Sequence, residues 1–569
     1  MAEGYRGMKK QRFVLLKKDP ALFSTLVIIW VLFGIFIFLP VFRLLLAAFV
    51  VDGKPSFANL AAVMKTSYNI RALYGSLLLA TTVGISGTVL GYIFALAVTR
   101  TTLPRWGKNI LSAITILPLI SPPFTSSISL TLALGPNGML LQLFGIENFT
   151  IYGFWGTWLS ETLTYFPIAF MVIEAILNTM SANLDDAALS LGSTKWRLFR
   201  TVTVPLSLPG IANSFLLVFG ASLADFATPL ILGGHSFPVL PTEAYLLITG
   251  LFDLKGGASL SFLLLVPALI VFLMQRLVLG RKSFVSVTGK SGARTVFSGL
   301  PVSLSVIIGI VCTIVSAFVI YLYAIILWGS FVKVWSVNNT FTWEHYAYVF
   351  QHGKKAILDT LAIALVSTVL GSILGIVIGY VTQRKTFPGK RFFEFGSLLN
   401  YALPGTVVGI AYIIAFNQRP LLLTGTMTIL VAAYVFRYYA TGIRAVSASL
   451  EQIDPALEEA SLSLGAGSVR TFTHVTIPLI MPAVLSGTRY LFIHCMTAIS
   501  ATIFLVSVHW TLLTTRILES MTELQFSQAS AFSIVLILIV FAGDAIMRGL
   551  IKLSSMKFHQ SVREVAHHE

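Results

Sequence analysis

The feature that most constrains this chain is a series of long apolar segments. A helix needs about 20 predominantly apolar residues to cross the hydrocarbon core of a bilayer. Twelve segments of the sequence meet that need: 21–50, 72–98, 110–134, 151–176, 209–232, 259–279, 299–331, 356–382, 395–416, 425–446, 483–506 and 531–550. Charged residues make up only 11% of the chain, against about 25% in soluble proteins. We therefore expect an all-α polytopic membrane protein.

The net charge of +16 is explained by membrane topology. If the N-terminus lies inside, the predicted cytoplasmic segments and the span ends next to them hold 27 Lys and Arg, the external segments hold 9, and three lie deeper within spans. Lys and Arg gather in the cytoplasmic loops of membrane proteins. The sequence therefore predicts cytoplasmic N- and C-termini and a lipid bilayer as surroundings, and it gives no reason to expect nucleic acid as a partner.

The two halves of the chain are related in sequence. Placing 184–209 over 457–482 gives 13 identities in 26 positions, and a weaker match joins 87–104 to 371–388. In the weaker match Arg100 stands against Arg384. Six spans in each half is an even number, so both halves enter the bilayer in the same direction, as a parallel repeat. We predict a first repeat at 1–280, a cytoplasmic linker at 281–298 and a second repeat at 299–569.

Each half carries one cytoplasmic loop, 177–208 and 447–482, that is longer than a connection between spans needs. In both loops an acidic pair lies in the first turns of a predicted short helix, where the helix dipole favours negative charge. Small residues follow, and a glycine then ends the helix in a left-handed conformation. The residues are Asp185, Asp186, Ala187, Ala188 and Gly192 in the first loop and Glu458, Glu459, Ala460, Ser461 and Gly465 in the second. One such loop fits an interfacial amphipathic segment equally well, but two matched copies favour a docking element.

The ends of the loop helices are also predicted from the sequence. Asn183 and Asp454 are residue types that cap helix N-termini. A second short helix follows each glycine, and we expect it to end at Pro205 and Pro478, because proline breaks a helix interior.

The stretches DDAALSLG (185–192) and EEASLSLG (458–465) resemble the EAA loops of binding-protein-dependent ABC importer permeases. The departures are small, since Asp186 replaces Glu in the first motif and Ser461 replaces the second Ala in the second. The resemblance covers nearly the whole chain, as two fused permease domains of the type I importer fold.

This resemblance implies the partners of the chain. Each loop would insert into a groove of a cytosolic ABC ATPase subunit, and two similar loops on one chain imply an ATPase homodimer that binds the ATP and Mg. A solute-binding protein would deliver cargo on the outer face. The implied location is the bacterial cytoplasmic membrane.

The sequence predicts no enzyme activity for the chain itself. A P-loop ending at Gly289-Lys290-Ser291 would need glycine where Phe284 stands. We find no catalytic constellation, no cofactor motif and no firm metal site, and Cys312 and Cys495 lie far apart in apolar runs.

Ionisable residues inside spans are candidates for the transport pathway, because burying them in a membrane is costly. Asp225, Glu161 and Arg437 are our candidates, and structural pairing remains an equal alternative for the two acids. For Arg489 and Asp544 we favour an ion-paired or snorkelling role. On the external segment 233–258, Glu243 and Asp253 are candidate contacts for the binding protein, although this segment can also simply pack on the external face.

Fused double permeases of this length most resemble those of ferric-iron importers, with thiamine, 2-aminoethylphosphonate and polyamine systems as near relatives. Carboxylates such as Asp225 suit a hard cation like Fe(III), whereas Arg437 suits a phosphonate. An ion-coupled secondary transporter is the alternative of another class. It would need broken helices and ion sites at the midplane, and it leaves the duplicated cytoplasmic loop unexplained.

Overall fold

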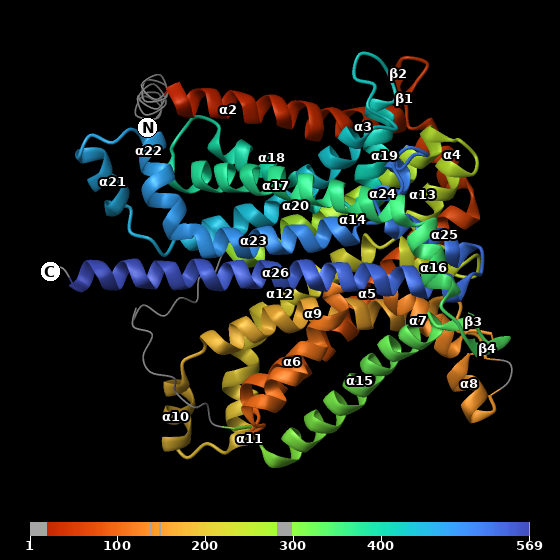
Figure 1. The fold of residues 1–569 in the computed structure, drawn as a ribbon, viewed down its shortest axis with the longest axis horizontal. Helices are drawn as coiled ribbons and strands as arrows, with labels where there is room; N and C mark the ends of the chain where they lie inside the picture. Colours follow the sequence, from red (N-terminus) through yellow and green to blue (C-terminus); the bar gives the residue numbers. More distant parts are fainter. Residues whose placement is uncertain (1–19, 137, 147–148, 281–298, 568–569) are drawn as a thin grey trace.

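The chain folds almost entirely into helices. The computed structural model describes residues 20–136, 138–146, 149–280 and 299–567 (Figure 1). The only named strands in these ranges form two antiparallel hairpins, β1 (Val50–Val51) with β2 (Lys54–Pro55) and β3 (Val332–Val334) with β4 (Asn338–Phe341). The prediction of an all-α polytopic membrane protein is confirmed. The predicted linker 281–298 lies outside the described residues.

In the first half of the chain, the described residues between 20 and 280 form thirteen α-helices and three short π-helical turns. They are α2 (Pro20–Phe33), η1 (Gly34–Phe38), α3 (Leu39–Phe49), α4 (Ala58–Lys65), α5 (Ser67–Arg100), α6 (Arg105–Ile120), α7 (Thr125–Leu134), α8 (Met139–Phe144), α9 (Phe154–Thr179), α10 (Ala182–Ser190), α11 (Lys195–Leu198), η2 (Phe199–Thr203), α12 (Val204–Leu223), η3 (Pro229–Gly233), α13 (Leu240–Thr249) and α14 (Leu254–Gly280).

The second half, residues 299–567, repeats much of this order. Its helices are α15 (Val302–Gly329), α16 (Glu344–Gln351), α17 (Lys354–Arg384), α18 (Lys390–Ala402), α19 (Gly405–Phe416), α20 (Met427–Leu450), α21 (Ala456–Ser463), α22 (Ser468–Thr471), η4 (Phe472–Thr476), α23 (Ile477–Thr497), α24 (Thr502–Leu505), α25 (Leu513–Thr522) and α26 (Phe526–His567).

The number of spans differs from the twelve that the sequence predicts. Within the described ranges ten helices are long and apolar enough to cross a membrane, or eleven if the bent pair α18 and α19 counts as one span. Helix α20, which occupies the predicted span 425–446, is not among the ten. It is long enough, but it carries two arginines and three tyrosines and is therefore more polar than an ordinary span.

Two predicted spans are broken rather than continuous. The segment 395–416 turns by 104° between α18 and α19, at Leu403 and Pro404. The segment 110–134 stops at Ile120 and resumes at Thr125, and Pro122 and Pro123 lie between. Proline has no backbone N–H to donate and disfavours helical geometry in the residue before it. The two breaks occupy the same place in the element order of the two halves.

Each half is built around a compact group of three helices. Helix α5 packs against α9 and α12, and α17 packs against α20 and α23 in the same way. Glycine allows the closest approach, because a Cβ added at Gly91 would lie 2.6 Å from Ala169 Cβ, and one at Gly375 would lie 2.9 Å from Tyr439 O. These two glycines are the ones that the internal repeat matches.

The first helix of each half packs against the other half. Helix α3 lies against α19, and the Tyr412 hydroxyl donates a hydrogen bond to Phe36 O at 2.7 Å. Conversely, α15 lies against α5, α6 and α7, and the Ser129 hydroxyl donates to Leu322 O at 2.8 Å. The two halves are therefore interlocked. In Figure 1, α2 lies at the top beside helices of the second half, and α15 lies at the bottom beside helices of the first half.

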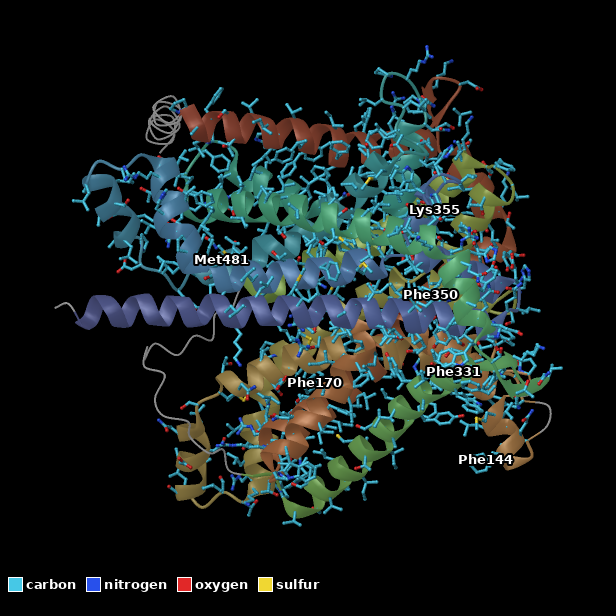
Figure 2. All side chains as sticks on the ribbon, in the orientation of Figure 1. Phe144, Phe170, Phe331, Phe350, Lys355 and Met481 are labelled. Carbon is cyan, nitrogen blue, oxygen red and sulfur yellow. The ribbon has the colours of Figure 1, made fainter. Side chains whose placement is uncertain are left out.

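The two ends of the molecule differ in character. The short helices α10 and α21 lie at the same end as the two termini of the described chain, and both hairpins lie at the opposite end (Figure 1). Around Phe331, near hairpin β3–β4 (Figure 2), the rings of Phe341, Trp343 and Tyr346 pack with centroids 4.9 to 5.2 Å from that of Phe331. Aromatic groups of this kind gather at membrane–water interfaces.

Candidate functional site

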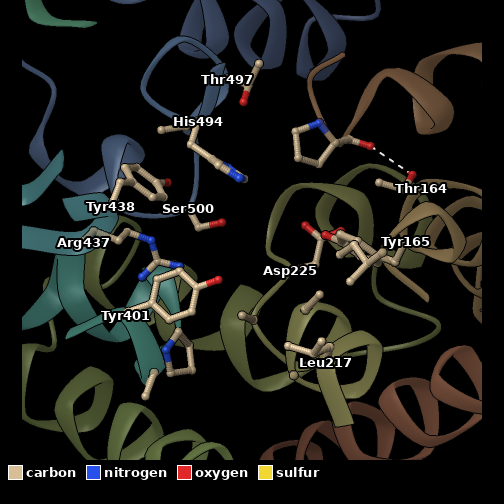
Figure 3. A pocket seen from close by; sticks show the side chains of 18 of the residues that line it. Thr164, Tyr165, Leu217, Asp225, Tyr401, Arg437, Tyr438, His494, Thr497 and Ser500 are labelled. Atoms are coloured by element: carbon tan, nitrogen blue, oxygen red, sulfur yellow. Dashed lines mark hydrogen bonds between the residues drawn. The ribbon is translucent and has the colours of Figure 1, made fainter. Parts of the chain in front are cut away.

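A cavity of about 310 Å³ lies between the two halves, where the helices break. The first half contributes residues from the end of α6, from α9 and from the end of α12, and the second half contributes residues from the α18–α19 break, α20 and α23 (Figure 3). The polar side chains on its walls are Ser121, Thr164, Tyr165, Asp225, Gln275, Tyr401, Arg437, Tyr438, Tyr490, His494, Thr497 and Ser500.

The wall from the first half is acidic. Asp225 follows the end of α12, where the helix stops at Leu223, and its carboxylate Oδ1 accepts a hydrogen bond from Ala227 N at 3.1 Å. Only 4% of its surface is exposed. Tyr165 and Thr164 lie beside it on α9 (Figure 3). Because α12 stops at Leu223, the carboxylate of Asp225 lies on the same wall as the phenol of Tyr165 and the hydroxyl of Thr164.

The predicted pathway residue Glu161 does not line this cavity. Its side chain is fully buried, and its carboxylate accepts a hydrogen bond from the Ser222 hydroxyl of α12. Glu161 therefore joins α9 to α12 behind the acidic wall. Of the alternatives that the sequence left open for this acid, the structure favours structural pairing.

The wall from the second half is cationic and aromatic. Arg437, near the middle of α20, donates a hydrogen bond through Nη1 to Leu403 O at 2.9 Å, and its guanidinium carbon lies 5.6 Å from the centre of the Tyr438 ring. His494 stacks on Tyr438 at 5.3 Å and meets Tyr490 edge-on at 4.3 Å. Over the described part of the chain, no carboxylate forms an ion pair with Arg437.

The two walls give the cavity opposite charges on opposite sides. Oxygen atoms of carboxylate, phenol and hydroxyl groups suit hard cations, and a guanidinium suits carboxylate or phosphate oxygens. Among the described residues, no three His, Cys, Asp or Glu side chains lie close enough together to hold a metal ion. The cavity can therefore contact a charged solute without being built as a multidentate metal centre.

The loop helices α10 and α21, which we call the coupling helices after the role that the resemblance implies, end in the same way. Gly192 and Gly465 have φ of +81° and +87°. The next N–H groups reach back into the helices, from Ser193 N to Ala188 O at 3.0 Å and from Ala466 N to Ser461 O at 3.1 Å. This is the left-handed helix end that the sequence predicts.

The other ends of the loop helices differ in detail from the prediction. The N-cap of α10 is Ser181, whose hydroxyl accepts a hydrogen bond from Asn183 N, so Asn183 is the second residue of the helix and not its cap. In the second loop the N-cap of α21 is Pro455, so Asp454 precedes the cap, and its Oδ1 accepts a hydrogen bond from Ala456 N at 2.9 Å.

The helices after the two glycines do not stop at Pro205 and Pro478, as the sequence suggested. They continue into α12 and α23 through the π-helical turns η2 and η4. In these wider turns Val204 N bonds to Phe199 O, and Ile477 N bonds to Phe472 O. Each proline then falls in the first turn of the following α-helix, where its missing N–H costs little.

The acidic pairs of the two coupling helices divide into inner and outer members. Asp185 and Glu458 face the protein and form ion pairs with Arg100 and Arg384, at 2.5 Å and 3.2 Å. Asp186 and Glu459 are exposed, as are Ala187 and Ala460, whereas Ala188 and Ser461 are half-buried. The exposed face therefore carries one acid and one alanine of each motif. The sequence did not identify the two arginines as part of the site, although the internal repeat had matched them.

The two acids predicted to meet a binding protein lie in different surroundings. Glu243 is in the first turn of α13 and is buried, and this burial raises the pKa of its carboxyl group. Asp253 is exposed, and its Oδ1 accepts a hydrogen bond from Gly256 N at 2.9 Å near the start of α14. Asp253 is therefore the one of the two that a partner can reach.

The favoured role of Arg489 and Asp544 is also visible. Arg489 on α23 pairs through Nε with Asp544 Oδ1 on α26, and Arg548 Nε lies 2.8 Å from Asp544 Oδ2. The prediction that these groups are ion-paired is confirmed.

Two related halves around a shared cavity, each with a coupling helix at the same end, are the architecture of a membrane permease. Comparison with known families agrees with this class. Residues 87–334 and 371–558 each match the family described as binding-protein-dependent transport system inner membrane component. The chain belongs to this family, as its loop motifs had indicated.

Individual relatives extend over most of the chain. It is 34% identical to the ferric transport system permease protein FbpB of Actinobacillus pleuropneumoniae, over 93% of this chain and 78% of that protein. It is 37% identical to the putative ferric transport system permease protein FbpB 1 of Haemophilus influenzae, over 86% of this chain and 78% of that protein. A shorter match, 30% identical, joins 32% of this chain to 82% of the molybdenum transport system permease protein ModB of Escherichia coli.

Proposed function

We propose that this chain is the permease subunit of an ATP-driven importer of ferric iron. The observation that carries the proposal is the likeness to two ferric transport permeases across 93% and 86% of the chain. The molybdenum permease matches only one third of it. A likeness that includes both halves and the cavity between them bears more directly on the cargo than one confined to a single half.

The chemistry of the cavity is compatible with this cargo. Asp225 and the phenol of Tyr165 stand on one wall, and Tyr401 and Tyr438 stand on the other. Carboxylate and phenol oxygens are ligands that a hard cation accepts. A phosphonate would bind Arg437, so 2-aminoethylphosphonate is a second candidate cargo. Thiamine and polyamines are cations that the wall with Asp225 would attract, and they form a third candidate group.

We further propose that α10 and α21 insert into a homodimer of cytosolic ATPase subunits, which bind the ATP and Mg. The exposed faces of the two helices share an acid, an alanine and the same glycine end, so identical partners can bind both. Under this proposal the end with α10, α21 and both termini is cytoplasmic. A solute-binding protein docks at the opposite end, where Asp253 is exposed.

Transport then follows from one two-state motion. When the ATPases close on ATP they move the two coupling helices together, and the angle between the halves changes so that the cavity opens to the docked binding protein. A partner can shift such an equilibrium only by binding one state more tightly. The broken helices at the cavity also satisfy one requirement of an ion-coupled transporter, so the source of energy must be tested directly.

The test is uptake in a bacterial strain that lacks this protein, with and without its restoration. Labelled ferric iron is compared with thiamine, 2-aminoethylphosphonate, putrescine and molybdate. We expect restoration of iron uptake alone, and we expect it to survive collapse of the ion gradients when ATP is supplied. Restored uptake of another solute would overturn the iron assignment, and dependence on an ion gradient would overturn the importer mechanism.

A further inference from the structure

Two ion pairs, one buried and one partly buried, hold the coupling helices to helices that are not their neighbours in sequence. Arg100 is the last residue of α5, and its Nη1 lies 2.5 Å from Asp185 Oδ2 of α10. Only 3% of each side chain is exposed. Arg100 Nη2 also lies 3.4 Å from the sulfur of Met180, which caps the end of α9. One side chain therefore joins the ends of α5 and α9 to the coupling helix.

The second half repeats this arrangement. Arg384 is the last residue of α17, and its Nε lies 3.2 Å from Glu458 Oε1 of α21. Its Nη2 donates hydrogen bonds to Leu450 O at 3.1 Å and to Ile453 O at 2.7 Å, at the end of α20. Again one arginine joins the ends of two core helices to the coupling helix. The exposed fractions are larger here, 13% for Arg384 and 12% for Glu458.

The recurrence is not a by-product of chain length. The arginine and the acid are 85 residues apart in the first half and 74 residues apart in the second. The intervening loops and helices therefore differ by 11 residues, yet the same two groups meet. Because the ion pair forms in both halves despite this difference in length, it serves the same purpose in each half.

The two acids of each coupling helix lie on different faces, so one can hold the helix to its own half while the other meets a partner. Successive residues on a helix point about 100° apart, so Asp185 and Glu458 turn inwards while Asp186 and Glu459 remain exposed. Asp186 and Glu459 are free to meet an ATPase, whereas Asp185 and Glu458 are held by their arginines.

We propose that Arg100 and Arg384 are positioning residues that transmit the movement of the coupling helices to the three-helix groups of the two halves. The polypeptide itself joins α10 to α9 and α12, and it joins α21 to α20 and α23. The ion pair links the coupling helix to the third helix of its group, which is α5 in the first half and α17 in the second. A coupling helix held at all three helix ends moves its half as one body, whereas one released from α5 or α17 can tilt without moving the cavity wall.

The inference rests on the proposed ATP-driven function, and its test compares two matched acids on one helix. Glu458→Gln keeps the shape of the side chain and removes the ion pair with Arg384, and Glu459→Gln makes the same change on the exposed face. Complexes with the ATPase subunits are placed in liposomes with the binding protein. Uptake of radiolabelled Fe(III) and hydrolysis of ATP are then measured on the same samples.

For Glu458→Gln we expect continued ATP hydrolysis with uptake per ATP reduced about tenfold, a loss within the normal range of coupling between two sites. Arg384→Gln, which removes the charge from the other side of the pair, should lower the same ratio. For Glu459→Gln we expect fewer ATPase subunits retained on purification but an unchanged ratio in the complexes that remain.

Other outcomes separate the two proposals. A wild-type complex without ATP-dependent uptake would contradict the proposed function. Normal wild-type uptake with an unchanged ratio in Glu458→Gln, or a fall of uptake and hydrolysis in equal proportion, would overturn the transmission role. If Glu458→Gln does not assemble, Arg384→Lys, which keeps the charge but cannot reach all three partners, is judged by the same ratio.

Discussion

The left-handed glycines that end the coupling helices give the sharpest test of the site. A residue with a side chain costs about 1–2 kcal/mol in this conformation, because its Cβ crowds the following carbonyl oxygen. Apart from the adjacent backbone, a Cβ at Gly192 or Gly465 would meet no atom within 4 Å. Valine at these positions is therefore strained by its backbone alone, and the rest of the fold has no steric reason to fail.

The cost is large enough to matter for a short surface helix. A change of 1–2 kcal/mol alters the ratio of the formed to the frayed helix end by about 5- to 30-fold. The two sites lie on different helices and share no contact, so their costs add to about 2–4 kcal/mol in the double variant. We expect Gly192→Val with Gly465→Val to abolish transport and weaken retention of the ATPase, while the protein still reaches the membrane.

The second loop supplies a matched control. Gly467 also has no atom within 4 Å of a Cβ, but its φ is −74°, which any residue can adopt. Uptake and ATPase retention should fall in the order Gly465→Asn, Gly465→Ala, Gly465→Val, because asparagine tolerates the left-handed region best, and Gly467→Val should resemble wild type. Equal activity throughout the series, or equal damage from Gly467→Val, would refute the argument from backbone strain.

Three further predictions follow from the cavity, the helix packing and the external face. Asp225→Asn should lower iron uptake by about 10- to 100-fold, as expected for loss of a bond to a charged group, and should do so more than Glu161→Gln, which changes an acid behind the wall; equal losses would argue against a pathway role. Gly91→Ala should lower the thermal unfolding temperature, since the added Cβ lies 2.6 Å from Ala169 Cβ and such overpacking costs about 1–3 kcal/mol, whereas Gly309→Ala, with no atom within 4 Å, should not. Burial raises the pKa of Glu243, so the folded state favours its protonated form and loses this contribution as pH rises through that pKa; Glu243→Gln should therefore raise the unfolding temperature at about pH 8 and make little difference at about pH 4, and the opposite dependence would contradict the assignment.

The positions of the helices were largely predictable from apolar content, but their continuity was not. Proline marks both broken spans, at Pro122–Pro123 and Pro404, yet Pro167 and Pro267 lie inside the unbroken helices α9 and α14. Neighbouring helices can satisfy the carbonyl that an interior proline leaves free. Whether a proline breaks a span is therefore decided by packing that the local sequence does not contain.

The coupling helices were predictable because their signals are local. Acidic first turns, small residues and a terminal glycine all fall within about two turns of helix, and the duplication showed that they belong together. The ion pair of Asp185 is different in kind, because Arg100 lies 85 residues away and no local pattern joins them. The same limit explains Glu161, whose partner Ser222 is 61 residues distant.

The exchange of first helices between the halves has a consequence for how the protein is made. Phe36 is synthesised 376 residues before Tyr412, to which its carbonyl is bonded. At about 5–20 residues per second, roughly 20–75 s separate the two. During that interval α2 and α3 must remain stable in lipid without the α18–α19 surface that they finally cover. Helices α2 and α3 are thus made well before the surface on which they finally pack.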